Sequence, residues 1–147
     1  DDFDKQISAY RREETKLRNK IAELRSKSKI YAATAHDLQA CRTYKSVWLE
    51  YASKPLTQKD TFYKQNEAAL QAYSRAASQL DKIGISSLVD SEKVQQLVSE
   101  TEAQINKLIT QLENLQQIVK TLQLSKETVE KIQYGDINSN HSDFSRL

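Results

Sequence analysis

Apolar residues return at seven-residue intervals through the first third of the chain. One series is Tyr10, Leu17, Leu24, Tyr31 and Leu38. The companion series, in which the second and fourth members are polar, is Ile7, Glu14, Ile21, Ser28 and Ala35. Such a repeat is typical of a helix that packs one face against another helix. Pro55 disfavours helical geometry at the residue before it. We therefore predict one long helix over about residues 3–53.

A shorter helix is expected over about residues 58–83. Thr57 is a suitable N-cap, and Asp60 follows three residues later, as in a capping box. Gly84 stands where a residue in the left-handed conformation commonly ends a helix. Small alanine side chains on this helix allow another helix to approach closely.

A third helix is predicted over about residues 88–133. Ser87 and Asp90 suggest its start, and Gly135 suggests its end. The remaining residues, 135–147, are rich in Asn, Ser and Asp, and we expect a disordered tail. The two heptad series of this helix are Val98, Ile105, Leu112 and Val119, and Thr101, Leu108, Leu115, Leu122 and Val129.

These elements predict an all-α fold with two long helices and one shorter helix. With only two Gly and one Pro, the chain has few turn residues for a sheet. We expect residues 1–134 to form one elongated three-helix bundle or antiparallel coiled coil. The short helix can cover only part of each long one, where we expect an aromatic three-helix core. Its expected members are Tyr31, Tyr44, Trp48, Tyr51, Phe62, Tyr63 and Tyr73.

Composition narrows the class of protein. No apolar run approaches the length of a membrane span, so we expect no membrane partner. Cys41, the single cysteine, cannot form an internal disulfide, and we interpret it as a small core residue. A cytoplasmic location is the default reading. The absence of Met leads us to expect a piece of a longer protein, or a processed one.

The sequence shows no constellation of catalytic, cofactor-binding or metal-ligating residues. His36 and His141 lie more than a hundred residues apart, and a metal site needs several ligands at one point. Two glycines are too few for a glycine-rich phosphate loop. We therefore name no catalytic residue, no metal ligand, no cofactor and no small-molecule substrate, and interpret both histidines as structural or solvated.

Positive charge is concentrated near the N-terminus. Residues 5–29 hold nine Lys or Arg and three Glu, a local charge of +6 in a chain of net charge +2. Arg11, Arg18 and Arg25 recur every seven residues, which predicts a stripe beside the apolar seam. Such a stripe could follow a DNA phosphate backbone, and the alternative is a solvated coiled-coil flank. The candidate DNA-phosphate contacts are Arg11, Lys16, Arg18, Lys20, Arg25, Lys27 and Lys29.

Three stretches resemble the C-terminal helical region of MobA-type relaxases from conjugative and mobilisable elements of Gram-positive bacteria. The first is LRSKSKI at 24–30. The second is YKSVWLEY at 44–51 with KDTF at 59–62, which is similar to a YKPVxxEY…KxxF pattern. The third is YSRAASQL at 73–80, which is similar to YxxAxxxL and precedes a Leu-rich helix ending in VEKI at 129–132. Order and spacing agree over residues 17–133.

The resemblance implies a parent protein that nicks DNA at an origin of transfer. The family does so with a tyrosine nucleophile and a histidine-bound metal in an N-terminal domain, and neither motif is present here. The implied role of this chain is that of a non-catalytic accessory domain for DNA holding, dimerisation, or docking to relaxosome or secretion proteins. The alternative is a structural coiled coil that binds protein and no nucleic acid.

Overall fold

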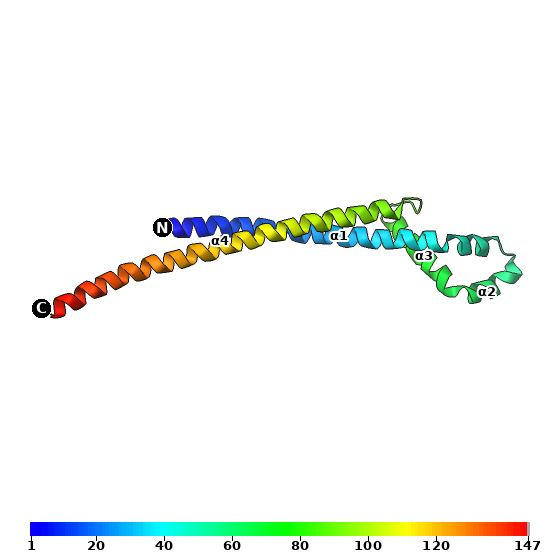
Figure 1. The fold of residues 1–147 in the computed structure, drawn as a ribbon. Helices are drawn as coiled ribbons and strands as arrows, with labels where there is room; N and C mark the ends of the chain where they lie inside the picture. The colour runs from blue at the N-terminus through cyan, green and yellow to red at the C-terminus, as the bar shows by residue number, and fades with distance from the viewer. Residues whose placement is uncertain (147) are drawn as a thin grey trace. The chain divides into compact units, whose positions relative to one another are not determined.

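The protein is all-α, as predicted. The computed structural model describes the backbone of residues 1–146 and the side chains of residues 1–135. Its helices are α1 (Asp2–Ser53), α2 (Leu56–Gln65), α3 (Glu67–Lys82) and α4 (Ser91–Arg146), and the described residues contain no strand (Figure 1). The chain divides into unit 1, Asp1–Glu23 with Gln104–Leu147, and unit 2, Leu24–Ala103.

Unit 1 is a pair of antiparallel helical segments, the first part of α1 and the later part of α4 (Figure 1). Its seam buries Ile7 and Ile21 from α1 against Ile105 and Val119 from α4. Glu14 occupies a seam position of α1 and is also buried. The heptad pattern thus identified the packed face of α1, including its polar member.

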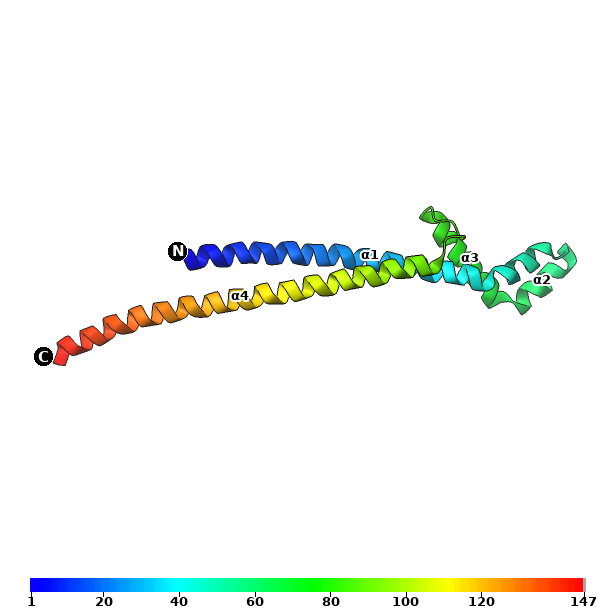
Figure 2. The same ribbon diagram turned by 45° about the horizontal axis from the view of Figure 1, so that its top comes forward.

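Unit 2 combines the later part of α1, all of α2 and α3, and the first part of α4, as Figure 2 shows. Leu38 of α1 and Leu80 of α3 are 2% and 1% exposed and belong to one continuous core with Val94 of α4. Cys41 and Ala76 belong to the same core, and both have small side chains. Cys41 is therefore the small core residue that the sequence predicted.

The length of α1 follows from the absence of helix breakers before Pro55. At its start, the Asp1 carboxylate accepts a hydrogen bond from the backbone N–H of Phe3 at 2.8 Å. Acidic Asp2 and Asp4 in the first turn complement the helix dipole. The observed bounds agree with the predicted range to within one residue.

The expected second helix is two helices, separated at Asn66. The backbone of Asn66 leaves the helical region, with φ −128° and ψ 25°. Its side-chain amide donates to the carbonyl oxygen of Phe62 at 3.0 Å. Asn competes with the helical backbone for hydrogen bonds in this way, whereas the helix predicted over residues 58–83 continued through this position.

Capping differs from the prediction at two helix starts. The helix α2 begins at Leu56 with Pro55 as its N-cap and no side-chain cap, so Thr57 lies inside the helix. Proline has a fixed φ, here −60°, which suits the residue before a helix, so α2 begins two residues before the predicted start at residue 58. The helix α4 begins at Ser91, because the carboxylate of Asp90, rather than Ser87, accepts the backbone N–H of Glu92 at 2.9 Å.

Gly84 ends α3 as predicted. It has a positive φ of 71°, and its N–H bonds to the Asp81 carbonyl oxygen at 3.1 Å. The next N–H, of Ile85, reaches the Leu80 carbonyl oxygen at 3.0 Å. This pair of bonds is the Schellman motif, which satisfies carbonyl groups at a helix end.

Gly135 does not end α4, which continues to Arg146. A glycine lowers helix stability without forbidding helical geometry, so it is a weaker stop than proline. The predicted disordered tail, 135–147, lies almost entirely outside the residues whose side chains the structure describes, and it stays a prediction.

The aromatic three-helix core that we expected is wrong. The buried core of unit 2 is built from aliphatic and small residues, with Tyr31 and Tyr73 packed at its edge. The other rings form a half-buried cluster around the end of α1. Tyr51 lies 6.4 Å from Phe62 and 5.9 Å from Tyr63 between ring centroids.

Candidate nucleic-acid interface

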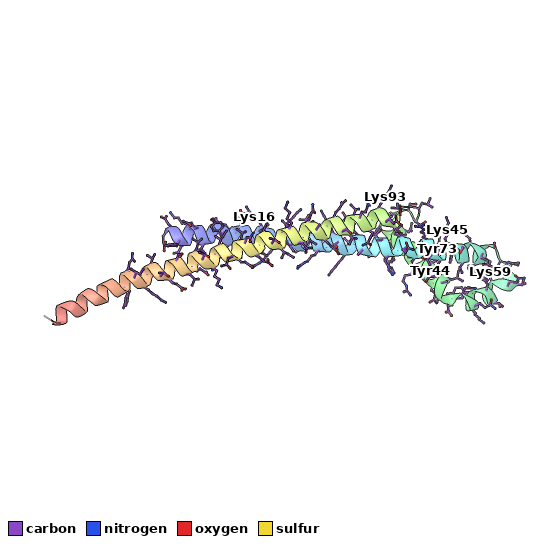
Figure 3. All side chains as sticks on the ribbon, in the orientation of Figure 1. Lys16, Tyr44, Lys45, Lys59, Tyr73 and Lys93 are labelled. Atoms are coloured by element: carbon purple, nitrogen blue, oxygen red, sulfur yellow. The ribbon has the colours of Figure 1, made fainter. Side chains whose placement is uncertain are left out.

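All seven candidate DNA contacts lie on α1 and are exposed. Those in unit 1 are Arg11, Lys16, Arg18 and Lys20, and Figure 3 labels Lys16 among them. Those in unit 2 are Arg25, Lys27 and Lys29.

The basic residues follow both flanks of the α1 seam rather than one. Arg11, Arg18 and Arg25 each come one residue after a seam position. Lys20 and Lys27 each come one residue before the seam residues of the companion series, which places them on the opposite flank. The heptad positions therefore place Lys20 and Lys27 on the flank opposite the arginine stripe, while Lys29, four residues after Arg25, lies on the arginine flank.

Several of these cations have acidic neighbours along α1. Lys16 lies 3.4 Å from Glu13, and Arg18 lies 3.5 Å from Glu14. Both partners of the Lys16–Glu13 pair are exposed, so it contributes little free energy and a phosphate can compete for Lys16, whereas the Glu14 partner of Arg18 is buried. Within the part of the chain whose side chains are described, no ion pair involves Arg11, Arg25 or Lys29.

The part of α4 that lies opposite the α1 cations of unit 1 has few acidic residues. Between residues 104 and 126 it holds one acidic residue, Glu113, and the lysines Lys107, Lys120 and Lys126. The Lys126–Asp4 ion pair fixes the antiparallel register, in which Lys120 falls opposite Tyr10 and thus beside Arg11. Sequence reasoning missed Lys107 and Lys120, because the α1 residues beside a lysine of α4 can be identified only when the register of the two helices is known.

Among the described side chains, no three His, Cys, Asp or Glu residues lie close enough together to hold a metal ion. Burial, followed by the charge of Asp37, raises the pKa of the Cys41 thiol, which keeps it protonated. The exposed ring of His36 lies 3.9 Å from Asp37. His141 lies outside the described side chains.

No helix in the described chain combines the length and apolar character required to cross a membrane. Comparison of the chain with protein-family models, with curated proteins and with solved structures finds no match.

Proposed function

We propose that this chain is a non-catalytic accessory domain of a DNA relaxase, and that it holds DNA through phosphate contacts from α1. The relaxase assignment rests on the resemblance of the three sequence stretches. The DNA-holding role rests on one observation: the α4 segment opposite the exposed α1 cations of unit 1 holds a single acidic residue, Glu113. Arg11 is the clearest case, because it forms no ion pair among the described side chains and the register places it beside Lys120.

Phosphate contacts predict a salt-dependent, sequence-tolerant affinity. Each neutralised duplex phosphate contributes a slope of about −0.9 to the dependence of log affinity on log salt concentration. An interface built from the arginine stripe therefore weakens steeply as salt rises. It also weakens in proportion when the arginines are removed.

Fluorescence anisotropy with labelled single- and double-stranded DNA, at low and moderate salt, tests the proposal. The triple variant Arg11→Gln, Arg18→Gln, Arg25→Gln is expected to bind more weakly, with a duplex salt slope that is shallower by up to about 3 units. The variant Lys20→Gln, Lys27→Gln reports on the opposite flank of the seam.

The matched control removes three exposed charges elsewhere, in the variant Arg75→Gln, Lys82→Gln, Lys131→Gln. It should bind DNA almost as well as the unaltered chain. Equal losses in the control and in the arginine variant would show a diffuse charge effect and reject the interface. Unchanged anisotropy with the unaltered chain at low salt would reject DNA holding altogether.

A second candidate function is a coiled-coil scaffold that binds protein, including a second copy of itself. It is favoured by exposed apolar side chains in the later part of α4, among them Val129, Ile132 and Tyr134. In the register fixed by Lys126 and Asp4, Val129 falls opposite Asp1. Ile132 and Tyr134 therefore have no described α1 residue opposite them.

Sedimentation equilibrium over a range of protein concentrations tests self-association. If α4 mediates it, Ile132→Glu with Tyr134→Glu should restore a monomer, while Ile30→Glu, at an exposed site on α1, should not. A monomer at every concentration of the unaltered chain would reject the dimer.

A further inference from the structure

Unit 2 contains a pocket that none of the functional arguments above uses. Its volume is about 440 Å³, within the range of small-ligand sites. The α1 side chains Leu38 and Cys41 and the α3 residue Tyr73 form an apolar part of the lining. The rest comes from α1 and from the segment 87–92, which connects α3 to α4 and begins α4.

Two cations stand on the α1 side of this pocket. Arg42 and Lys45 both line it, and they lie three residues apart and therefore on one side of the helix. Both are exposed, and within the described side chains neither forms an ion pair. The α1 side of the pocket thus offers two uncommitted positive charges to an anionic group.

Two carboxylates also line the pocket. Asp90 and Glu92 line it at the start of α4. The Asp90 carboxylate already caps the backbone N–H of Glu92, so this helix start is not free to bind a second anion. Carboxylates here repel anions and accept hydrogen bonds from N–H donors. The lining therefore offers cations for an anionic group, on α1, and acceptors for N–H donors, at the start of α4.

An aromatic ring also lines the pocket. Tyr73 lines the pocket and stacks on Trp48, with ring centroids 5.0 Å apart and an interplanar angle of 19°. Figure 3 labels Tyr73 and Lys45, which belong to this lining. A flat, unsaturated ring has a natural stacking partner in such a site.

We propose that this pocket binds a nucleotide whose base carries an amino group, either a free nucleotide or one unit of a single DNA strand. The phosphate pairs with Arg42 and Lys45, the base lies against Tyr73, and the amino group donates to Asp90 or Glu92. Carboxylate side chains accept from the amino group of cytosine in this way, whereas thymine has no amino group and can donate only from its ring N3–H. The proposal rests on the proposed function only for its choice of DNA as a source.

Trp48 is the single tryptophan of the chain, so its fluorescence reports on the stack beside the pocket. Titration with dCMP is expected to change the emission in a saturable way, with an affinity at least about fivefold higher than that of dTMP. Inorganic phosphate should bind more weakly than either nucleotide. Short oligo(dC) binding more tightly than dCMP identifies a DNA strand as the source, and equal affinities identify the free nucleotide.

The variant Arg42→Gln, Lys45→Gln should lose most of the dCMP affinity, while Arg75→Gln, Lys82→Gln should retain it, with circular dichroism confirming helicity in both. Glu92→Gln should narrow the difference between dCMP and dTMP. Equal affinity for dCMP and dTMP in the unaltered chain, or no saturable change with either, overturns the proposal. Tighter binding of a zwitterionic dipeptide than of dCMP overturns it as well.

This outcome is separable from that of the proposed function. Loss of duplex binding in the α1 arginine variant with an intact dCMP titration supports the α1 interface alone. An intact dCMP titration in a chain that never binds long DNA leaves a nucleotide pocket and rejects DNA holding.

Discussion

The ammonium group of Lys126 lies 2.5 Å from Oδ1 of Asp4, across 122 positions of sequence. Asp1 lies 3.9 Å from the same ammonium group, so two carboxylates share one cation. The contact joins the beginning of α1 to α4 within unit 1. The hydrogen bond from Lys126 lowers the pKa of Asp4, and the hydrogen bond to Asp4 raises the pKa of Lys126.

Asp4→Asn should lower the urea midpoint of unfolding at neutral pH. Because the folded-state pKa of Asp4 is lowered, its stabilisation is present above its ordinary value of 3.8 and is lost as pH falls through the folded value. The pKa of Lys126 is raised, so the stabilisation that its charge contributes is lost only as pH rises beyond the ordinary lysine value of 10.5. The effect should be small and salt-sensitive, because both groups are accessible to solvent.

Circular dichroism during urea unfolding at several pH values measures this difference. Asp2→Asn is the control, since Asp2 lies in the same first turn of α1 and forms no ion pair among the described side chains. A difference between Asp4→Asn and the unaltered chain that persists at strongly acidic pH would contradict the assignment.

Glu14→Leu should stabilise unit 1. Glu14 is 8% exposed at a seam position, and its partner Arg18 lies 3.5 Å away. Burying a carboxylate costs solvation free energy, whereas Leu would add apolar burial to the seam. We expect the free energy of unfolding to rise by about 1 kcal/mol. Glu13→Leu, at the exposed neighbouring position, should give no such gain, and a loss in Glu14→Leu would mean that the ion pair is net favourable.

Leu80→Ala should destabilise unit 2 strongly. Leu80 is 1% exposed and packs in the core with Leu38 and Val94. Removing a buried leucine side chain forfeits its transfer free energy and leaves a cavity, at a cost of about 2–5 kcal/mol. Leu49→Ala, at a position that is 56% exposed, should change the free energy of unfolding by about 0.5 kcal/mol or less. Similar losses in the two variants would contradict the core described here.

The same substitution should have opposite effects at the two glycines. Gly84 has φ 71°, and Ala there is strained by about 1 kcal/mol although nothing lies within 4 Å of the added Cβ. Gly135 lies within α4, where Ala should stabilise the helix by roughly 0.5–1 kcal/mol. Thermal unfolding of Gly84→Ala and Gly135→Ala measures both. A neutral or stabilising Gly84→Ala would argue against the left-handed turn at the end of α3.

Heptad spacing predicted the helices and their packed faces, because a seven-residue apolar repeat has few structural solutions. The break at Asn66 was missed, since one polar residue within a helical pattern leaves the direction of its side chain open. The start of α4 at Asp90 was displaced for a related reason: Ser87 and Asp90 are both good caps, and tertiary packing selects one. The aromatic residues were expected in the core, which is instead built from aliphatic and small residues with Tyr31 and Tyr73 at its edge.

The exposure of the basic residues on α1 followed from the sequence, and their division between two flanks was already present in the heptad positions. The contributions of Lys107 and Lys120 required the antiparallel register, which the Asp4 ion pair reveals. The pocket could not be predicted from the sequence. Its lining joins Arg42, Tyr73 and Asp90, which come from three segments that only the folded chain brings together.

The helix α2 buries none of its residues. In unit 2 its half-buried rings Phe62 and Tyr63 pack against Tyr51 of α1. The ammonium group of Lys59 also lies 4.8 Å from the centre of the Tyr51 ring. A segment held by such contacts opens at a lower free energy than the core around Leu38 and Leu80. Amide hydrogens of α2 should therefore exchange with solvent well before those of α3, which makes α2 the first cooperative unit of unit 2 to open.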